Sequence, residues 1–332
     1  MDDPRTVVHK AIAFERPDRL PVAGYGVSDT TWLMPDLMGG APADGGIDEW
    51  GCRWSVSHLK NIGQVTGHPI DDLDRLDAHP WPDAARPDRT ASMAERARAL
   101  EADPGRRVRF RITPIFNTCW ERMQFLHGME NCLIALMEDE PGIHELADRI
   151  IDWCLVVIDR VGDAAGSSID AMYFTDDWGS ETNALISPAL FRSFFLPRYR
   201  RLFAAVHDRG WRVWLHSCGR INALMPGLIE AGVDVLNMQQ PLVNGIEETG
   251  DAFAGRVCFE SMCDIQKTLP AGDPAKIRTE AAALLQYWGT ADGGFILGDY
   301  GDAEAIGIDP SLKTTVLEAF RSQEVWSTTC SR

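Results

Sequence analysis

The stretch RVWLHSCGRINALMPGLIEAGVDVLNMQQP, residues 212–241, places two short apolar runs on either side of a helix-like segment. The first run ends at His216 and Cys218, and the second ends at Asn237 and Gln240. A helical pattern over residues 220–231 fills the space between them. A strand, a helix and another strand in this order predict two parallel strands joined by a helical crossover.

The same alternation extends over most of the chain. Five further runs have the composition of strands: RLPVAGYG (19–26), RVRFRITPIF (107–116), DAMYFTDDWG (170–179), RVCFESMCD (256–264) and GGFILGDYG (293–301). A long helix is predicted from Ser187-Pro188 to His207, because serine before proline is a common helix start. Seven strands are visible, one fewer than a closed barrel needs. We therefore expect an α/β fold, a (β/α)8 TIM-type barrel formed by residues 1–332 as one domain with an N-terminal extension.

Composition narrows the functional classes. A net charge of −17 argues against a nucleic-acid partner, because such proteins present clustered Lys and Arg. No stretch approaches the roughly 18 consecutive apolar residues of a membrane span. The N-terminus, MDDPRTVVHK, lacks the features of a signal peptide, so we expect a cytoplasmic protein with no membrane association. The eight cysteines lack the spacing of a disulfide framework, and we expect them to be reduced.

Polar residues close several of the predicted strands, and in a TIM barrel such residues form the active site. His216 and Cys218 are two residues apart on one strand, so both side chains can face the same metal ion. The alternative is that the histidine binds a neighbouring carbonyl and the cysteine only packs. Without further context this second reading is favoured.

Longer motifs provide that context. They are FERPDRLPV (14–22), DEWGCRW (48–54), GHPIDDL (67–73), CWERMQFLHGMEN (119–131), FTDDWG (174–179), SPALFRSFFLPRYRRL (187–202), HSCGRINALMPGLIEAGVDVLNMQQP (216–241) and DIQKTLPAGDP (264–274). Together they make the chain, from Arg5 to Phe320, resemble the uroporphyrinogen decarboxylase superfamily. The resemblance is to its corrinoid-dependent zinc methyltransferase, or O-demethylase, branch.

The resemblance implies that His216 and Cys218 bind Zn²⁺. The third protein ligand in that branch is usually a cysteine near the last strand, but GGFILGDYGDAEAIG (293–307) contains none. Asp299 is our candidate, and Asp302, Cys263 and Glu260 are the alternatives. The implied reaction moves a methyl group between a small methoxy, methylthio or methylamino substrate, or a thiol acceptor, and a corrinoid. The corrinoid (cobalamin) is expected on a carrier protein, and a homodimer is also compatible with this reading.

Other residues are assigned by their place at strand ends. Asp177 is expected to be catalytic, by contacting substrate or orienting a ligand, while its neighbour faces the opposite way and could cap a helix or loop. Glu121 is a second catalytic candidate, although a carboxylate at a helix start is also favourable by itself. The expected substrate-binding residues are Asp176, Trp178, Asn237, Gln240 and Tyr25.

Two alternatives to methyl transfer remain open. One is a metal-free decarboxylase or lyase acting on a small aromatic acid, and the other is a non-catalytic subunit that binds a corrinoid partner. Porphyrinogen decarboxylation itself is not expected, because its many carboxylates require an arginine-rich loop after the first strand. The corresponding loop here, VAGYGVSD (22–29), contains neither Arg nor Lys.

Overall fold

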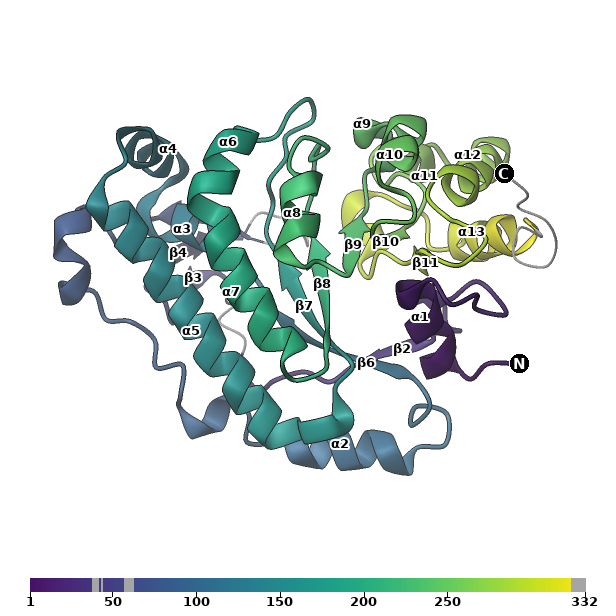
Figure 1. The fold of residues 1–332 in the computed structure, drawn as a ribbon, viewed down its shortest axis with the longest axis horizontal. Helices are drawn as coiled ribbons and strands as arrows, with labels where there is room; N and C mark the ends of the chain where they lie inside the picture. The colour runs from purple at the N-terminus through teal and green to yellow at the C-terminus, as the bar shows by residue number, and fades with distance from the viewer. Residues whose placement is uncertain (38–41, 43, 57–62, 324–332) are drawn as a thin grey trace.

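Eight strands form a nearly closed parallel barrel surrounded by helices, as expected (Figure 1). The structure is a computed structural model that describes residues 1–37, 42, 44–56 and 63–323. The order around the barrel is β1-β11-β10-β9-β8-β7-β6-β2. The strands are β1 (Val22–Ala23), β2 (Thr30–Trp32), β6 (Phe110–Ile115), β7 (Ala171–Thr175), β8 (Arg212–His216), β9 (Val235–Met238), β10 (Cys258–Ser261) and β11 (Phe295–Gly298).

The strand that the sequence pattern did not reveal is β2. It is three residues long and follows β1 after a loop of residues 24–29, with no helical crossover. Gly24, Tyr25 and Gly26 all have positive φ angles, of 130°, 53° and 72°, which turns the chain back on itself. The Asp29 N–H then donates to the Val22 carbonyl at 2.6 Å. In the described chain no ladder joins β1 to β2, and the barrel is open there.

Helices cover the outside of the barrel, and one of them, α1, closes an end of it. They are α1 (Pro4–Ala13), α2 (Met93–Ala102), α3 (Trp120–His127), α4 (Met129–Glu138), α5 (Pro141–Ala165), α6 (Pro188–Leu190), α7 (Leu196–His207), α8 (Met225–Ala231), α9 (Pro241–Asn244), α10 (Ile246–Phe253), α11 (Thr268–Ala271), α12 (Pro274–Tyr287) and α13 (Leu312–Arg321). Short 3-10 segments are η1 (Leu73–Ala78), η2 (Pro87–Arg89), η3 (Gly166–Ser168) and η5 (Ala303–Ile306), and η4 (Phe191–Phe195) is a π-helical turn. The helix predicted from Ser187 to His207 is therefore α6, η4 and α7 in succession, with Ser187 accepting the Leu190 N–H at 3.1 Å.

The N-terminal end of the barrel is filled by apolar residues and closed by α1. Inward-facing residues of six strands form one buried cluster with the apolar face of α1; its members are Val7, Val8, Ala11, Ile12, Phe110, Ile112, Ala171, Trp214, Val235, Cys258 and Ile296. Two backbone hydrogen bonds hold α1 in place, from Arg5 N–H to the Val108 carbonyl and from Gly294 N–H to the Ala11 carbonyl. This end of the barrel is therefore blocked.

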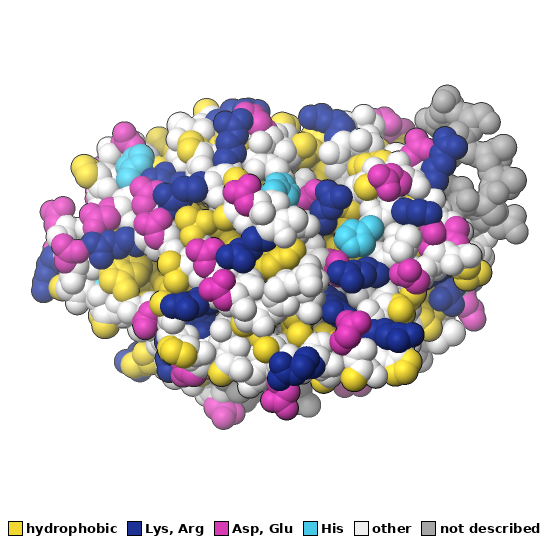
Figure 2. Space-filling view, turned by 60° about the horizontal axis from the view of Figure 1, so that its bottom comes forward, with side chains coloured by type: hydrophobic (Ala, Val, Ile, Leu, Met, Phe, Trp, Pro, Cys, Tyr) yellow, Lys and Arg dark blue, Asp and Glu magenta, His cyan; other side chains and the backbone are white. Residues whose placement is uncertain are grey.

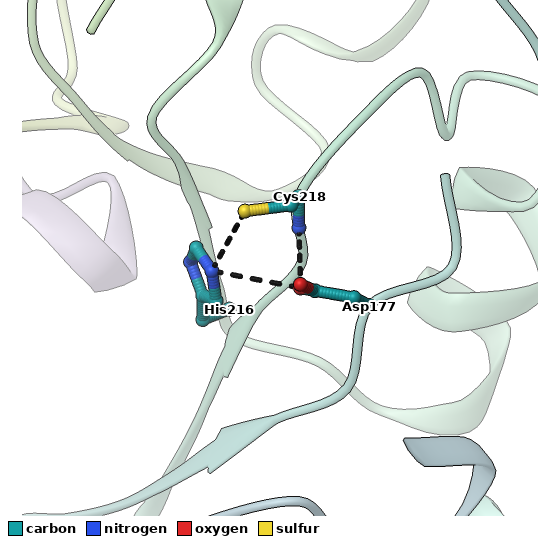
Figure 3. Close-up of side chains that lie close together, drawn as sticks. All are labelled: Asp177, His216 and Cys218. Atoms are coloured by element: carbon teal, nitrogen blue, oxygen red, sulfur yellow. Dashed lines mark hydrogen bonds and ion pairs between the residues drawn. The ribbon is translucent and has the colours of Figure 1, made fainter. Parts of the chain in front are cut away.

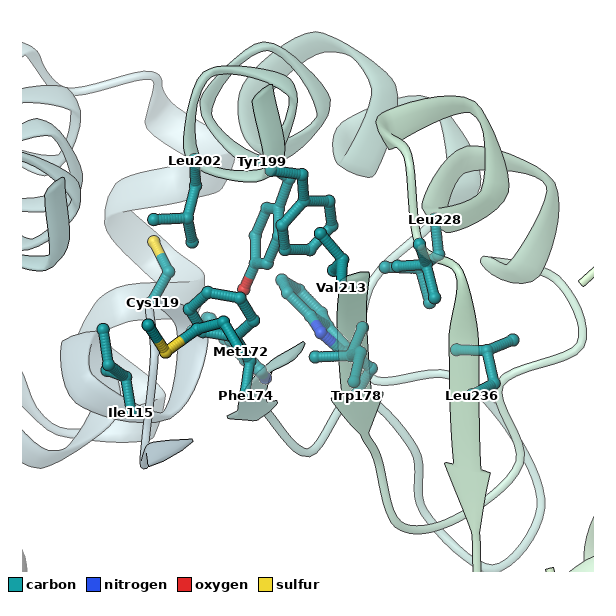
Figure 4. Packing of buried hydrophobic residues seen from close by; sticks show 14 of the residues in the cluster. Ile115, Cys119, Met172, Phe174, Trp178, Tyr199, Leu202, Val213, Leu228 and Leu236 are labelled. Carbon is teal, nitrogen blue, oxygen red and sulfur yellow. The ribbon is translucent and has the colours of Figure 1, made fainter. Parts of the chain in front are cut away.

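The outward-facing residues of the strands pack against the helices (Figure 4). Met172 and Phe174 of β7 and Val213 of β8 alternate with the inward-facing positions, as the two-residue period of a strand requires. Tyr199 and Leu202 of α7 cover them from outside. Each such fully buried side chain stabilises the fold by about 1.5–3 kcal/mol.

The surface carries both signs of charge, interspersed on the face shown in Figure 2. Ion pairs such as Arg198 with Asp148, at 2.8 Å, and Arg209 with Asp159, at 2.7 Å, link α7 and its C-terminal turn to α5. No helix in the described part of the chain is long and apolar enough to cross a membrane. The described cysteines are all free.

A small antiparallel sheet lies outside the barrel. Its strands are β3 (Gly46–Ile47), β4 (Arg53–Ser55) and β5 (Gln64–Gly67). The loops at 39–46 and 54–63 lie only partly within the described residues.

Candidate functional site

Asp177, His216 and Cys218 converge at the C-terminal mouth of the barrel (Figure 3). His216 is the last residue of β8 and Cys218 follows it by two. Because Thr175 of β7 pairs with His216, the residue two positions beyond Thr175 is brought beside them. The His216 Nε2 atom lies 3.4 Å from the Cys218 Sγ atom and 3.6 Å from the Asp177 Oδ1 atom. All three ligand atoms lie within 4.8 Å of one another.

The two distances from the His216 Nε2 atom fit one tetrahedral metal ion. With zinc-to-ligand bonds of about 2.0–2.3 Å, two ligand atoms on a tetrahedral zinc lie about 3.4–3.6 Å apart. Nitrogen, sulfur and carboxylate oxygen are also the ligands that zinc takes in proteins. Burial, followed by the nearby charges of Asp177 and Glu121, raises the pKa of the Cys218 thiol. A thiolate in these surroundings needs a cation, so the donor set fits a divalent metal.

The structure does not bring Asp299, the expected third ligand, to this pair. Its carboxylate accepts the Tyr25 N–H at 3.2 Å and pairs with the Lys313 ammonium at 2.8 Å. Within the described residues, Asp177 is the carboxylate that joins His216 and Cys218. Lys313 of α13 thus forms an ion pair with Asp299, the carboxylate that the sequence pattern had assigned to the metal.

The alternative third ligands are also engaged elsewhere. The Cys263 thiol is fully buried and donates to the Ile277 carbonyl in α12. Glu260 lies inside the barrel, where its Oε2 atom accepts the Trp214 indole N–H at 2.8 Å. Asp302 is exposed and precedes η5. In the described chain none of the three forms a group with His216 and Cys218.

Asp176 caps the start of a helix, and its assignment to substrate binding stays a prediction. Its carboxylate accepts the backbone N–H groups of Cys119, Trp120 and Glu121, at 3.0, 2.9 and 2.7 Å, where α3 begins. It also accepts the Tyr199 hydroxyl. Burial raises the pKa of the Asp176 carboxyl to about 6, against the opposing effect of these four donors. One of the two adjacent aspartates therefore enters the mouth while the other caps a helix, as strand alternation predicts.

Trp178 and Gln240 support the site from behind. Trp178 is fully buried among aromatic rings, with centroid distances of 4.8 Å to Phe195 and 5.8 Å to Tyr199 (Figure 4). The Gln240 Oε1 atom accepts the Gly219 N–H at 2.7 Å, which holds the turn after Cys218. Trp178 and Gln240 are both buried, and their assignment to substrate binding stays a prediction.

Asn237 is also used internally. Its Oδ1 atom lies 2.6 Å from the His216 Nδ1 atom, and its Nδ2 atom donates to Glu260 at 2.5 Å. Both ends of the amide are therefore occupied by protein groups. Asn237 thus lies behind the histidine, and its assignment to substrate binding stays a prediction.

Two predicted residues remain at the mouth. Glu121 lies in the first turn of α3, where burial, followed by the charges of Asp177 and Asp176, raises the pKa of its carboxyl well above the ordinary value. Tyr25 is half-buried in the left-handed turn after β1, and it lines a small pocket with Asp299, Tyr300 and Lys313. Their roles toward a substrate stay predictions.

Comparison with known proteins agrees with this architecture. Residues 60–299 match the uroporphyrinogen decarboxylase (URO-D) family. No curated protein matches the sequence. A methyltransferase from Methanosarcina mazei has a similar structure, with 16% identity and a TM-score of 0.65 over 97% of this chain and 99% of that one. A glycoside hydrolase family 5 enzyme from Prevotella bryantii B14 is more distant, with 9% identity and a TM-score of 0.44 over 93% and 99%.

At 16% identity, the likeness to the Methanosarcina protein shows a shared barrel fold and nothing finer. The family match is stronger, because it covers well over half of the chain and includes β6 to β11 with the whole Asp177, His216 and Cys218 group. The chain therefore belongs to the uroporphyrinogen decarboxylase family.

Proposed function

We propose that the protein is a zinc-dependent methyltransferase. It would move a methyl group between a small methoxy, methylthio or methylamino substrate, or a thiol acceptor, and a corrinoid held by a partner protein. The observation that carries this proposal is the convergence of three metal-ligand atoms at the mouth of a barrel of this family. The similar fold of a methyltransferase from Methanosarcina mazei supports the reaction class.

His216, Cys218 and Asp177 would hold the ion, with Asp177 taking the place first assigned to Asp299. A bound Zn²⁺ would act as a Lewis acid toward the heteroatom that gives up or receives the methyl group. Asp177 also accepts the Cys218 N–H at 2.7 Å, so the same carboxylate fixes the turn that carries the thiol. Three protein ligands leave a fourth position for substrate, as in catalytic zinc sites.

Other groups at the mouth would contact the substrate. We assign Glu121 to proton exchange with the substrate heteroatom, because its half-buried carboxyl lies beside Asp177. Trp32, which is 46% exposed, packs edge-on against Tyr173 at 5.1 Å. Tyr173 lies close enough to Cys218 and Asp177 for both to raise its pKa, after burial and Glu260. These two rings would form an apolar wall beside the reacting methyl group.

The charges at the mouth favour this reading over the aromatic-acid alternative. A carboxylated substrate needs a cation to bind it. The neighbouring charges that act most strongly on Cys218 are the carboxylates of Asp177, Glu121 and Glu181. The Lys313 ammonium is already paired with Asp299. An acidic mouth attracts a metal cation and repels an acid.

The corrinoid would be presented by a separate carrier protein, because a corrinoid is too large for the mouth of this barrel to enclose. The carrier would dock over the C-terminal face, where His216 and Cys218 lie.

Metal analysis and a transfer assay test the proposal together. Protein purified without added metal should contain or take up one equivalent of Zn²⁺, and His216→Ala should abolish this uptake. The zinc-loaded protein should transfer the methyl group of free methylcobalamin to one of a panel of small thiols, measured by the change in cobalamin absorbance. Stoichiometric zinc without transfer would support a non-catalytic partner subunit. Absence of zinc binding would refute the proposed metal site and favour a metal-free lyase.

A further inference from the structure

Three inward-facing polar residues lie side by side on β8, β9 and β10. His216 pairs in register with Asn237, and Asn237 pairs in register with Glu260. Two positions before each of them, the strand carries an inward-facing apolar residue; these residues are Trp214, Val235 and Cys258. A polar layer thus lies directly above the apolar layer of the barrel.

The hydrogen bonds in this layer have a fixed direction. The Trp214 indole can only donate, so Glu260 Oε2 is the acceptor of its N–H at 2.8 Å. The same oxygen lies 2.5 Å from the Asn237 amide nitrogen, which donates to it. The amide carbonyl of Asn237 must therefore point the other way, toward His216. This assignment holds whether or not the other Glu260 oxygen carries a proton.

The carbonyl oxygen in turn determines the state of the imidazole. Asn237 Oδ1 can only accept, and it lies 2.6 Å from His216 Nδ1. In the neutral ring, Nδ1 must carry the proton and Nε2 must carry the lone pair. That Nε2 atom is the one that faces Cys218 and Asp177, at 3.4 and 3.6 Å.

We propose that Trp214, Glu260 and Asn237 form a relay that holds His216 as the Nδ1-protonated tautomer and aims its Nε2 lone pair at the metal position. They are positioning residues, since they act through the histidine and are not expected to touch metal or substrate. The bound metal ion rests on the proposed function, whereas the histidine tautomer does not.

Burial makes the relay effective. Asn237 and Glu260 are 3% and 7% exposed, and Trp214 is fully buried, so water competes poorly for their hydrogen bonds. Partners that orient a metal-binding histidine in this way typically change metal affinity about 10- to 100-fold when they are replaced.

The tautomer can be read in the metal-free protein. Long-range proton–nitrogen NMR of protein labelled with ¹⁵N-histidine should show His216 as the Nδ1-protonated form. Asn237→Leu removes the acceptor and should give a mixture of tautomers or the Nε2-protonated form. In the same variant, Zn²⁺ should bind about 10- to 100-fold more weakly, measured by competition with a chromophoric chelator.

Three further variants separate positioning from general disruption. Glu260→Gln keeps an oxygen that can accept from both Trp214 and Asn237, so it should retain the wild-type tautomer and affinity, whereas Glu260→Met should resemble Asn237→Leu. Ser261→Ala is the matched control. It removes a buried hydrogen bond of 2.6 Å to the Met238 carbonyl next to the relay, and it should leave the tautomer unchanged.

An Nε2-protonated His216 in the wild-type protein would overturn the relay, as would an Asn237→Leu variant with wild-type tautomer and zinc affinity. The wild-type measurement needs no variant to fold. If the wild-type protein binds no zinc, the metal proposal fails, while the NMR result still decides whether the relay exists.

Discussion

The choice between Asp177 and Asp299 as the third metal ligand can be decided by one matched pair of substitutions. Asp177→Asn keeps an oxygen that can accept the Cys218 N–H, whose present length is 2.7 Å, so the turn should hold. It replaces a charged ligand by a neutral amide, which is a poor ligand for zinc. Asp299→Asn removes the ion pair with Lys313 but leaves an acceptor for the Tyr25 N–H.

The size of the effect follows from the number of ligands. Four-ligand zinc sites bind with apparent free energies of about 10–16 kcal/mol, or about 2.5–4 kcal/mol per ligand. Loss of the Asp177 carboxylate should therefore weaken Zn²⁺ binding roughly 70- to 900-fold. Asp299→Asn should leave the dissociation constant within about twofold, because its carboxylate does not belong to the ligand group.

Competition with a chromophoric chelator at constant pH measures both constants, and circular dichroism checks that each variant is folded. Cobalt(II) in place of zinc adds an independent measure, since one thiolate should give one set of sulfur-to-metal absorption bands. Cys263→Ser should leave these bands unchanged, because its thiol points toward α12. If Asp299→Asn weakens binding and Asp177→Asn does not, the geometric argument is refuted and the first assignment is restored.

Three further predictions concern the support of the site. Trp178→Ala should destabilise the protein by about 3–5 kcal/mol in urea unfolding, because it empties a fully buried aromatic position, and a changed KM at unchanged stability would instead indicate substrate contact. Tyr199→Phe removes a hydrogen bond to the Asp176 carboxylate and should lower the free energy of unfolding by about 1.5–3 kcal/mol while zinc affinity stays constant. A loss of zinc affinity would contradict the helix-capping role of Asp176. Burial by itself would raise the pKa of the Asp170 carboxyl. Hydrogen bonds from His9, the Arg111 N–H and Arg5 outweigh this effect and hold the pKa below its usual 3.8. The Asp170 carboxylate therefore stabilises the folded state above pH 3.8, and this stabilisation is lost as the pH falls through the lower pKa of the folded protein. Asp170→Asn should lower the free energy of unfolding at pH 7, and this free energy should fall less on acidification in the variant than in the wild type.

The sequence was most informative where one strand supplied two residues. His216 and Cys218 share a face because they are two apart, and this needs no knowledge of the rest of the fold. The apolar runs of seven strands were visible for a similar reason. The short strand β2 was not, because three residues after a tight turn leave no period to detect.

Residues brought together by strand register were harder to assign. Asp177 reaches His216 only because Thr175 of β7 pairs with His216 of the neighbouring strand β8, and no spacing in the sequence encodes that pairing. Asp299 was assigned to the metal because it closes a strand, but Lys313 from a helix 14 residues later binds it. The role of Asn237 depends likewise on its neighbours on both sides. The one available signal was that polar residues occupy the same inward position on successive strands.

The helix that closes the N-terminal end of the barrel constrains the order of events in any reaction at the opposite end. Because α1 shares one buried cluster with the interior residues of β6 to β11, small molecules have no exit through the barrel axis. If a carrier protein covers the mouth, it closes the route by which the small substrate enters. Substrate must then bind first and product must leave last, so steady-state kinetics should follow a compulsory order in which excess carrier slows turnover.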